Sequence, residues 1–234
     1  MAKVWYRLMF NYPPLSLEKV DYEAYWRDKR GGALGSLSGW QADRAALAAR
    51  IIGSGDPVMI TDIGSGDGSI LKYLNERIKI SRMIGVDLSP LALQQAEKFG
   101  VEPVLLDINN LEELAKLPET DYTLMLEILE HVPYSEQMLS VAHGKSRKGV
   151  IFSFPNTGFF VHRFRLLFGR FPLQWRLHPG EHLRYWTDRD LKWWLRSLGY
   201  KNYRVFYYRG MPILNKIWPS LFAAGFVVFV PKSA

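Results

Sequence analysis

The sequence predicts an α/β domain in which a mostly parallel sheet is covered by helices on both faces. Two observations lead to this prediction. From Pro57 onward, short apolar segments alternate with amphipathic ones, as strands and helices do around a parallel sheet. A glycine-rich loop follows the first apolar segment, and an acidic residue follows each of the next two, at Asp87 and Asp107.

The composition is that of a folded globular protein. The 234 residues are 48% hydrophobic and 23% charged, and none is cysteine. The lack of cysteine excludes a disulfide framework and a cysteine-ligated metal centre. Residues 217–230 form the most apolar stretch, which is too short for a membrane span and is broken by Pro219. We therefore expect a cytoplasmic protein with no membrane span and no signal peptide.

Residues 1–56 are expected to form an N-terminal helical extension, and residues 57–234 the main domain. Within the extension, residues 40–52 are rich in Ala, Leu and Arg, which favour helix, and this run ends at a glycine, Gly53.

Strand–helix alternation occupies the middle of the chain. The apolar segments predict strands, and the amphipathic segments between them predict helices, one of which has Ser89 as its N-cap and Pro90 in its first turn. The expected strands are 58–62, 82–86, 103–106, 122–126 and 149–154, and the expected helices are 69–78, 90–99, 111–116 and 135–142.

The alternation stops after Pro155. A basic and aromatic segment, residues 156–187, is expected to lie over the acceptor pocket as a lid. A helix is expected at residues 188–198. The β-rich runs 203–208 and 222–230 are expected to pair as an antiparallel edge.

Charge is distributed unevenly along the chain. The formal net charge is +7, but residues 157–209 hold eleven Lys and Arg against three Asp and Glu, a net charge of +8 for this segment alone. Such a segment either attracts an anionic partner, such as a phosphate-bearing substrate, a nucleic acid or a membrane face, or forms a solvated basic surface.

The loop after the first expected strand has the pattern D-x-G-x-G-x-G, from Asp62 to Gly68. Glycines let the backbone approach a ligand closely, and the helix that follows offers free N–H groups. A dinucleotide-binding fingerprint would need a glycine at position 69, where this chain has Ser69. The pattern therefore predicts a cofactor site of another kind.

Acidic residues after the next two strands support this site. A carboxylate at Asp87 can accept hydrogen bonds from both hydroxyls of a ribose. Asp107, followed by the apolar Ile108, suits the amine and the flat face of adenine. Ligands of open α/β sheets bind at this edge, where the parallel strands end.

With these motifs the chain resembles the class I S-adenosylmethionine-dependent methyltransferases. The resemblance implies a three-layer Rossmann-like fold with seven strands in the order 3-2-1-4-5-7-6. It also implies contacts to the cofactor, whose product is S-adenosylhomocysteine. Asp87 with Leu88 would hold the ribose, and Asp107 with Ile108 the adenine. The methionine part would lie against Asp62, Gly64, Ser65, Gly66 and Gly68.

The segment after the fourth strand, residues 126–133, faces both cofactor and acceptor in that family. Glu127 is accordingly grouped with the cofactor-binding residues. His131 is a candidate general base, since histidine titrates near neutral pH, with Glu130 beside it. Alternatively, Glu130 and His131 only fix a helix start and its loop.

A metal site is a further alternative. The E-x-x-E-H pattern, followed much later by a histidine, resembles small-RNA 3′-end 2′-O-methyltransferases and ubiquinone-biosynthesis O-methyltransferases. This resemblance implies Glu127, Glu130, His131 and His182 as possible ligands of a divalent ion. Many relatives carry the Glu-His-Val sequence without a metal, so the metal is the less favoured interpretation.

We expect an S-adenosylmethionine-dependent methyltransferase with a small-molecule acceptor. One alternative is an RNA-directed, metal-assisted 2′-O-methyltransferase, which the basic segment would suit. Another is a cofactor-binding partner of a metabolic enzyme with little catalysis. That alternative follows from the Ser-Phe-Pro-Asn stretch at residues 153–156, which resembles the MetW group of methyltransferase-like proteins.

Overall fold

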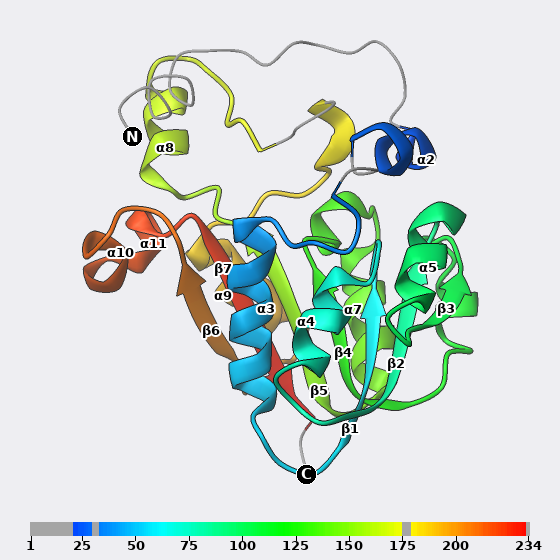
Figure 1. Cartoon of the computed structure of the whole chain (residues 1–234). Coiled ribbons are helices and arrows are strands. Elements are labelled where there is room, and N and C mark those ends of the chain that lie inside the picture. Colours follow the sequence, from blue (N-terminus) through cyan, green and yellow to red (C-terminus); the bar gives the residue numbers. More distant parts are fainter. Residues whose placement is uncertain (1–20, 30–32, 175–178, 233–234) are drawn as a thin grey trace.

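A computed structural model describes residues 21–29, 33–174 and 179–232 of the chain. Its centre is a seven-stranded sheet with the order β3-β2-β1-β4-β5-β7-β6 (Figure 1). The first five strands are parallel, and β7 pairs antiparallel with both β5 and β6. The strands are β1 (Val58–Ile63), β2 (Ile80–Asp87), β3 (Glu102–Leu105), β4 (Thr120–Leu126), β5 (Ser146–Pro155), β6 (Arg204–Tyr208) and β7 (Gly225–Pro231).

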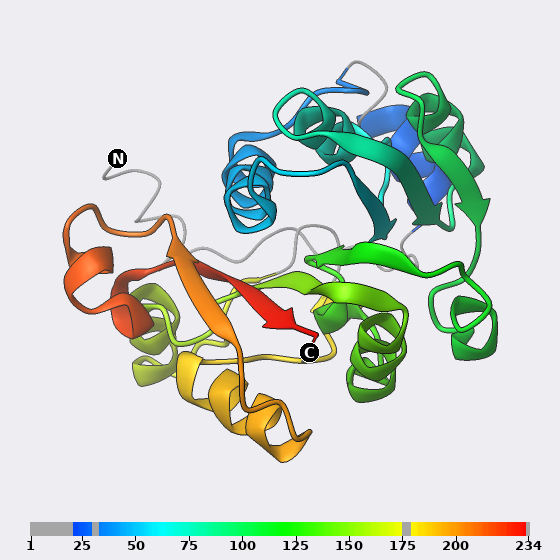
Figure 2. The same ribbon diagram turned by 90° about the horizontal axis from the view of Figure 1, so that it is seen from below.

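Helices cover both faces of the sheet, as Figures 1 and 2 show. The predicted fold class and strand order are therefore confirmed. The α-helices are α2 (Tyr22–Ala24), α3 (Gly39–Ile52), α4 (Ser69–Asn75), α5 (Pro90–Glu97), α6 (Leu111–Leu114), α7 (Ser135–Gly144), α8 (Phe160–Leu167), α9 (Asp188–Ser197), α10 (Leu214–Ile217) and α11 (Pro219–Phe222). Shorter turns are the π-helix η1 (Tyr25–Lys29) and the 3-10 helices η2 (Leu129–His131) and η3 (Pro179–Glu181).

Each face of the sheet has its own hydrophobic core. On one face, α3, α4 and α5 bury apolar side chains such as Ala48, Leu71 and Ala96 against the strands. On the other face, α6, α7 and α9 do the same with residues such as Leu139 and Trp194. The central strands β1, β4, β5 and β7 are therefore buried on both sides, as in parallel sheets generally, whereas the edge strand β3 is mostly exposed.

Local sequence signals explain where several helices begin. Ser89 caps α5 by accepting a hydrogen bond from the Ala92 amide, and Pro90 follows in the first turn, as predicted. Thr187 begins α9 through a capping box with Asp190.

The last β-rich run differs from its prediction. Residues 219–222 form α11, and β7 begins only at Gly225, so the prediction of a strand from Phe222 was wrong over its first residues. Pro219 is the cause, because proline is favoured in the first turn of a helix and cannot donate to a sheet. The antiparallel pairing of β6 with β7 is confirmed.

Two connections lie above the edge where the parallel strands end. The first is the N-terminal segment with α2 and η1, whose Glu23 accepts a 2.5 Å hydrogen bond from the Ser89 hydroxyl. The second consists of residues 156–174 and 179–187, with α8 and η3 (Figure 1). Among the described residues, none of the helices combines the length and apolar character needed to span a bilayer.

Candidate active site

A cavity of about 380 Å³ opens at the edge where β1 to β4 end. Its wall combines the N-terminal segment with the loops that follow the strands. The lining residues are Tyr25, Trp26, Gly64, Asp87, Leu88, Asp107, Ile108, Asn109, Glu127, Ile128, His131, Val132 and Glu181. The strand-end loops predicted to bind a cofactor thus meet the predicted acceptor loop around one cavity.

The glycine loop needs its glycines. Gly64 has φ 75°, and a Cβ there would collide with the Ile128 side chain. Gly66 has φ 53°, and a Cβ there would lie 2.6 Å from the Trp26 ring. Both positions combine a left-handed backbone with close approach of a cavity-lining side chain, which only glycine allows.

Asp87, at the end of β2, holds the glycine loop in place. Its carboxylate accepts hydrogen bonds from the Gly66 amide, at 2.8 Å, and from the Ser89 amide, at 3.0 Å. Burial raises the pKa of Asp87, and these backbone donors oppose the shift. Asp87 also lines the cavity, so one residue shapes the loop and faces the ligand space.

Asp62 lies beneath the loop. Its side chain is fully buried, and Oδ2 accepts no hydrogen bond from the part of the chain that the structure describes. Burial, reinforced by the nearby charge of Asp87, raises the pKa of Asp62 to about 8. A buried carboxyl without a partner is suited to receive a cationic group of a ligand.

The remaining predicted cofactor residues have different positions. Asp107 is exposed at the cavity rim, where its carboxylate accepts bonds from the backbone and side chain of Asn109, and Ile108 lies beside it. Asp62, Ser65, Gly66 and Gly68 are not part of the lining. The hydroxyl of Ser65 is buried and has no partner within the described ranges.

Glu127 is fixed by a network that the sequence did not reveal. Its backbone has φ 60°, unusual for a residue with a side chain. Ser153 accepts a hydrogen bond from the Glu127 amide and donates its hydroxyl to Oε1, at 2.9 Å. Tyr208 donates to the same oxygen at 3.4 Å, and the Arg44 guanidinium lies 3.9 Å from Oε2. These partners come from β5, β6 and α3, so no local motif announces them.

Glu130, next to this network, is buried with 1% of its surface exposed. Neither carboxylate oxygen has a hydrogen-bond partner among the described residues. Burial, and then the charge of Glu127, raise the pKa of Glu130 well above its usual range. In the structure, therefore, Glu130 favours the protonated form.

His131 lines the cavity, and a hydrogen bond at Nδ1 fixes the orientation of its ring. Nδ1 lies 2.5 Å from the Glu181 carbonyl oxygen, which makes Nδ1–H the donor and leaves Nε2 with its lone pair. Burial lowers the pKa of His131, so the neutral ring prevails at pH 7. A neutral imidazole with a free Nε2 has the form that a general base requires.

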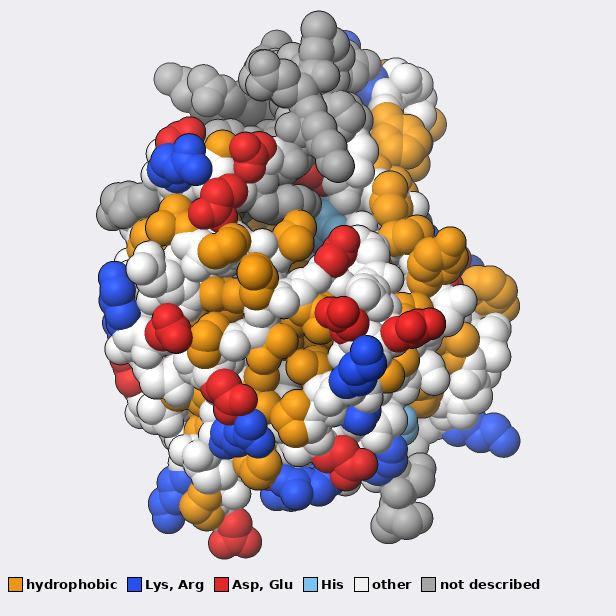
Figure 3. All heavy atoms as spheres, turned by 90° about the vertical axis from the view of Figure 1, so that its right-hand side faces the viewer, with side chains coloured by type: hydrophobic (Ala, Val, Ile, Leu, Met, Phe, Trp, Pro, Cys, Tyr) orange, Lys and Arg blue, Asp and Glu red, His pale blue; other side chains and the backbone are white. Residues whose placement is uncertain are grey.

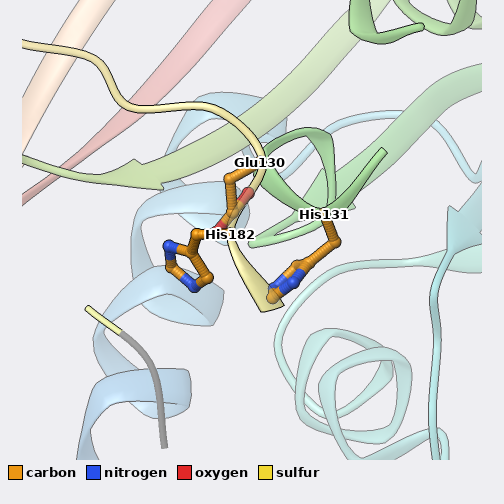
Figure 4. A group of neighbouring side chains, drawn as sticks. All are labelled: Glu130, His131 and His182. Atoms are coloured by element: carbon orange, nitrogen blue, oxygen red, sulfur yellow. The ribbon is translucent and has the colours of Figure 1, made fainter. Parts of the chain in front are cut away.

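His182 completes a compact group with Glu130 and His131. The two imidazole rings meet edge to face at 4.7 Å, and one potential ligand atom from each of the three residues lies within 4.8 Å of the others (Figure 4). Burial and the neighbouring His131 lower the pKa of His182 to about 3. Of the four candidate metal ligands in the sequence, the structure gathers these three, whereas Glu127 is held by Arg44 and Tyr208.

Two aromatic residues that line the cavity were not identified from the sequence. Tyr25 and Trp26 lie in the N-terminal segment, about 40 residues before the glycine loop, and both line the cavity. Their aromatic character within a polar helical stretch was the only available signal.

Comparisons with known proteins fit this architecture. A family model described as a methyltransferase domain matches residues 39–205. A SAM dependent methyltransferase from Archaeoglobus fulgidus is similar in structure, with a TM-score of 0.62 and 18% identity over 91% of this chain and 100% of that chain. Magnesium protoporphyrin IX methyltransferase (ChlM) from Synechocystis PCC 6803, with bound SAH, gives a TM-score of 0.61 and 16% identity over 91% of this chain and 98% of its own.

The small RNA methyltransferase HEN1 is also similar. Its TM-score is 0.62 at 23% identity, over 94% of this chain but only 27% of the HEN1 chain. At these identities the likeness to solved structures shows a shared fold. The search of curated proteins returned no match.

Proposed function

Because this chain belongs to the methyltransferase domain family and is an S-adenosylmethionine-dependent methyltransferase, we propose that its cavity holds that cofactor beside a small-molecule acceptor. The observation that carries the proposal is that the cofactor loops and the Glu127–His131 loop line one cavity. A volume of about 380 Å³ is within the range of small-ligand sites.

On the cofactor side, we assign the ribose to Asp87 with Leu88 and the adenine to Asp107 with Ile108. The methionine part is assigned to Asp62 and the backbone of Gly64, Ser65, Gly66 and Gly68, and Glu127 faces the same ligand. The fit rests on the close approach permitted at Gly64 and Gly66 and on the unpartnered Oδ2 of Asp62.

When bound, S-adenosylmethionine supplies an electrophilic methyl group on a sulfonium sulfur. The work left to the protein is alignment of the acceptor with that methyl, and alignment of this kind can supply roughly 7–11 kcal/mol of barrier reduction. His131 takes the acceptor's proton at Nε2, while the Glu181 carbonyl holds its Nδ1–H. The Glu130 backbone carbonyl accepts hydrogen bonds from the Leu183 and Arg184 amides, which ties this loop to the segment that carries Glu181.

A metal-assisted reaction on RNA is the second candidate. It is supported by the gathering of Glu130, His131 and His182 and by the likeness of fold to the small RNA methyltransferase HEN1. The donor set fits a divalent ion, because one carboxylate and two imidazoles are compatible ligands and both Glu130 oxygens lack other described partners. Such an ion would lower the pKa of a bound hydroxyl.

The decisive experiment is transfer of labelled methyl groups from S-adenosylmethionine into a cell extract separated into small-molecule, RNA and protein fractions. We expect label in the small-molecule fraction, with Mg²⁺, Mn²⁺ and EDTA making no difference. Label in RNA that disappears with EDTA and in the Glu130→Gln variant would establish the second candidate instead. Bound S-adenosylhomocysteine with no labelled fraction would favour a cofactor-binding partner protein.

We further propose the division of the chain into an N-terminal helical extension, residues 1–56, and a methyltransferase domain, residues 57–234, in which residues 156–187 form a lid-like segment. Residues 1–20, 30–32 and 175–178 of these parts lie outside the described residues. Supporting contacts with the cavity come from Tyr25 and Trp26 of the extension and from Glu181 of the lid-like segment. The cytoplasmic location stays a prediction.

A further inference from the structure

One surface of the molecule carries several large apolar side chains that are exposed among the described residues. At the end of α8, Leu167 is 78% exposed and Phe168 61%, with Leu166 and Phe171 also exposed. Large apolar residues that are exposed singly are ordinary, whereas a contiguous group marks an interaction site.

The second part of this surface is the turn formed by α10 and α11. Ile217 is 74% exposed and Trp218 57%, and Ile213 and Leu214 are exposed beside them. Ile213 has φ 68°, a strained conformation for a β-branched residue. Ile213 is 70% exposed, and no residue of α10 or α11 is fully buried.

The segments that carry the two parts contact each other at the start of α8. The Phe160 ring at the start of α8 packs against Phe222 of α11 at 5.8 Å, and the Asn156 side chain donates to the carbonyls of Ser220 and Ala223. In both ribbon views α8, α10 and α11 lie on the same side of the molecule (Figures 1 and 2). We name residues 166–171 and 213–218 the docking surface.

Charge indicates what the docking surface meets. The sequence has no Asp or Glu in residues 157–180 or 191–234. Lys192 and Arg209 of these segments pair with Asp188 and Asp43, and the docking surface itself carries two basic residues, Arg170 and Lys216. Lys216 is exposed among the apolar residues of the turn and has no acidic partner in the described ranges. By contrast, the side of the molecule seen in Figure 3 carries interspersed acidic and basic side chains.

From this geometry we propose that the docking surface binds the surface of a phospholipid bilayer that contains anionic headgroups. Trp, Leu, Ile and Phe side chains enter the boundary between headgroups and acyl chains, and basic side chains attract the anionic lipids. The proposal does not depend on the assigned cofactor or catalytic residues.

The placement of the docking surface has a consequence for acceptor supply. β5 and β6 are mutually parallel across β7, so the connections that follow them leave the sheet at the same edge as the loops around the cavity. Docking therefore turns that edge of the sheet toward the bilayer, where an amphiphilic acceptor would be held.

Co-sedimentation of the full chain with vesicles tests the proposal. Vesicles of phosphatidylcholine alone are compared with vesicles that also contain phosphatidylglycerol. We expect binding to the mixed vesicles, weaker binding at raised salt, and little binding to phosphatidylcholine alone. The double variant Ile217→Ser, Trp218→Ser should lose about ten-fold or more in vesicle affinity, and Lys216→Glu roughly five-fold or more.

Matched controls separate the surface from exposed apolar residues in general. Trp193→Ser, on α9, removes a tryptophan that is 64% exposed, and Leu105→Ser, on β3, a leucine that is 61% exposed. Both should bind vesicles like the wild type, whereas Leu167→Ser should bind less. Circular dichroism melting confirms that each variant is folded, and Leu167→Ser serves if the double variant is not.

Three results would overturn the proposal. One is a folded wild-type chain that binds neither kind of vesicle. Another is equal binding by the wild type and by the docking-surface variants. The third is a dimer, without vesicle binding, that the double variant dissociates, which would assign this surface to contact between two copies of the chain.

Discussion

The cofactor side and the acceptor side of the cavity are built from different parts of the chain. On the cofactor side, Asp87 accepts hydrogen bonds from Gly66 in the loop after β1 and from Ser89 in the loop after β2, and so ties these two loops together. The acceptor loop begins at Glu127, a proposed cofactor contact, whose carboxylate is held by residues far from it in sequence, namely Ser153, Tyr208 and Arg44.

The two sides differ in whether their buried polar side chains have hydrogen-bond partners. On the cofactor side, backbone donors satisfy the Asp87 carboxylate and oppose the rise of its pKa. On the acceptor side, Glu130 and His182 are buried with side-chain atoms that have no described partner. Unpaired buried polar groups destabilise a fold, so they are retained where they serve chemistry. We therefore expect the cofactor side to bind and the acceptor side to carry the reaction.

The largest expected effect comes from a substitution that should slow methyl transfer without weakening cofactor binding. His131→Ala should slow methyl transfer roughly 100- to 10,000-fold, the usual contribution of a general base. It should leave S-adenosylhomocysteine affinity nearly unchanged, because Asp87 and the glycine loop are intact. Transfer rates and isothermal titration measure the two quantities.

The control is His143→Ala on α7, whose imidazole meets the Pro231 carbonyl away from the cavity. It should transfer methyl groups at the wild-type rate. Full activity of His131→Ala with an identified acceptor would leave His131 with a structural role only.

Asp87→Ala should weaken cofactor binding, the property that His131→Ala leaves nearly unchanged. Removing this carboxylate deletes the proposed ribose contact and leaves the Gly66 and Ser89 amides without their acceptor. S-adenosylhomocysteine affinity should fall about 100-fold, since charge-assisted hydrogen bonds contribute more than neutral ones.

Asp107→Ala provides the comparison within the cofactor side. Because Asp107 is exposed and bonded to Asn109, we expect a loss of only about ten-fold in affinity. Equal affinities for the wild type and Asp87→Ala would refute the ribose assignment. Thermal melting shows whether the loop remains folded.

The same contrast explains what the sequence revealed. The D-x-G-x-G-x-G loop, Asp87 and Asp107 were predicted because each follows a strand directly and acts through local backbone geometry. The strand order followed from the family resemblance, and the structure confirmed it. Arg44, Tyr208 and Trp26 were missed because their roles depend on packing between segments far apart in sequence. The positive φ of Glu127 was also missed, because the partners that hold it are not local.

A smaller effect, dependent on pH, concerns Asp62. In the cofactor-free chain its pKa is about 8, so below that pH the carboxyl is mostly protonated and cannot pair with the cofactor's ammonium group. Cofactor affinity should therefore rise by up to about ten-fold per pH unit toward pH 8 and level off above it. Titration calorimetry from pH 6 to about 9 measures the slope.

The free energy of unfolding should change with pH in the opposite direction to the cofactor affinity. The folded pKa of Asp62 is raised above its unfolded value, so protonation favours the folded state, and the free energy of unfolding of the cofactor-free chain falls as pH rises from about 4 to about 8. Asp62→Asn should weaken both slopes. Unchanged slopes in this variant would assign the titration to another group.

The smallest expected effect concerns Trp26, an aromatic residue that lines the cavity beside the glycine loop. The Trp26 ring lies where a Cβ at Gly66 would be and lines the cavity, so Trp26→Ala should uncover the glycine loop. Loss of this apolar contact should weaken S-adenosylhomocysteine binding roughly five- to ten-fold, equivalent to about 1–1.4 kcal/mol.

Trp193→Ala, which removes an exposed tryptophan from α9, is the matched control and should bind as the wild type does. Because Trp26 lies outside residues 39–205, which the methyltransferase domain model matches, unchanged affinity in Trp26→Ala would confine cofactor binding to the strand-end loops. A measured loss would instead make the N-terminal segment a third contributor to the site, beside the cofactor loops and the acceptor loop.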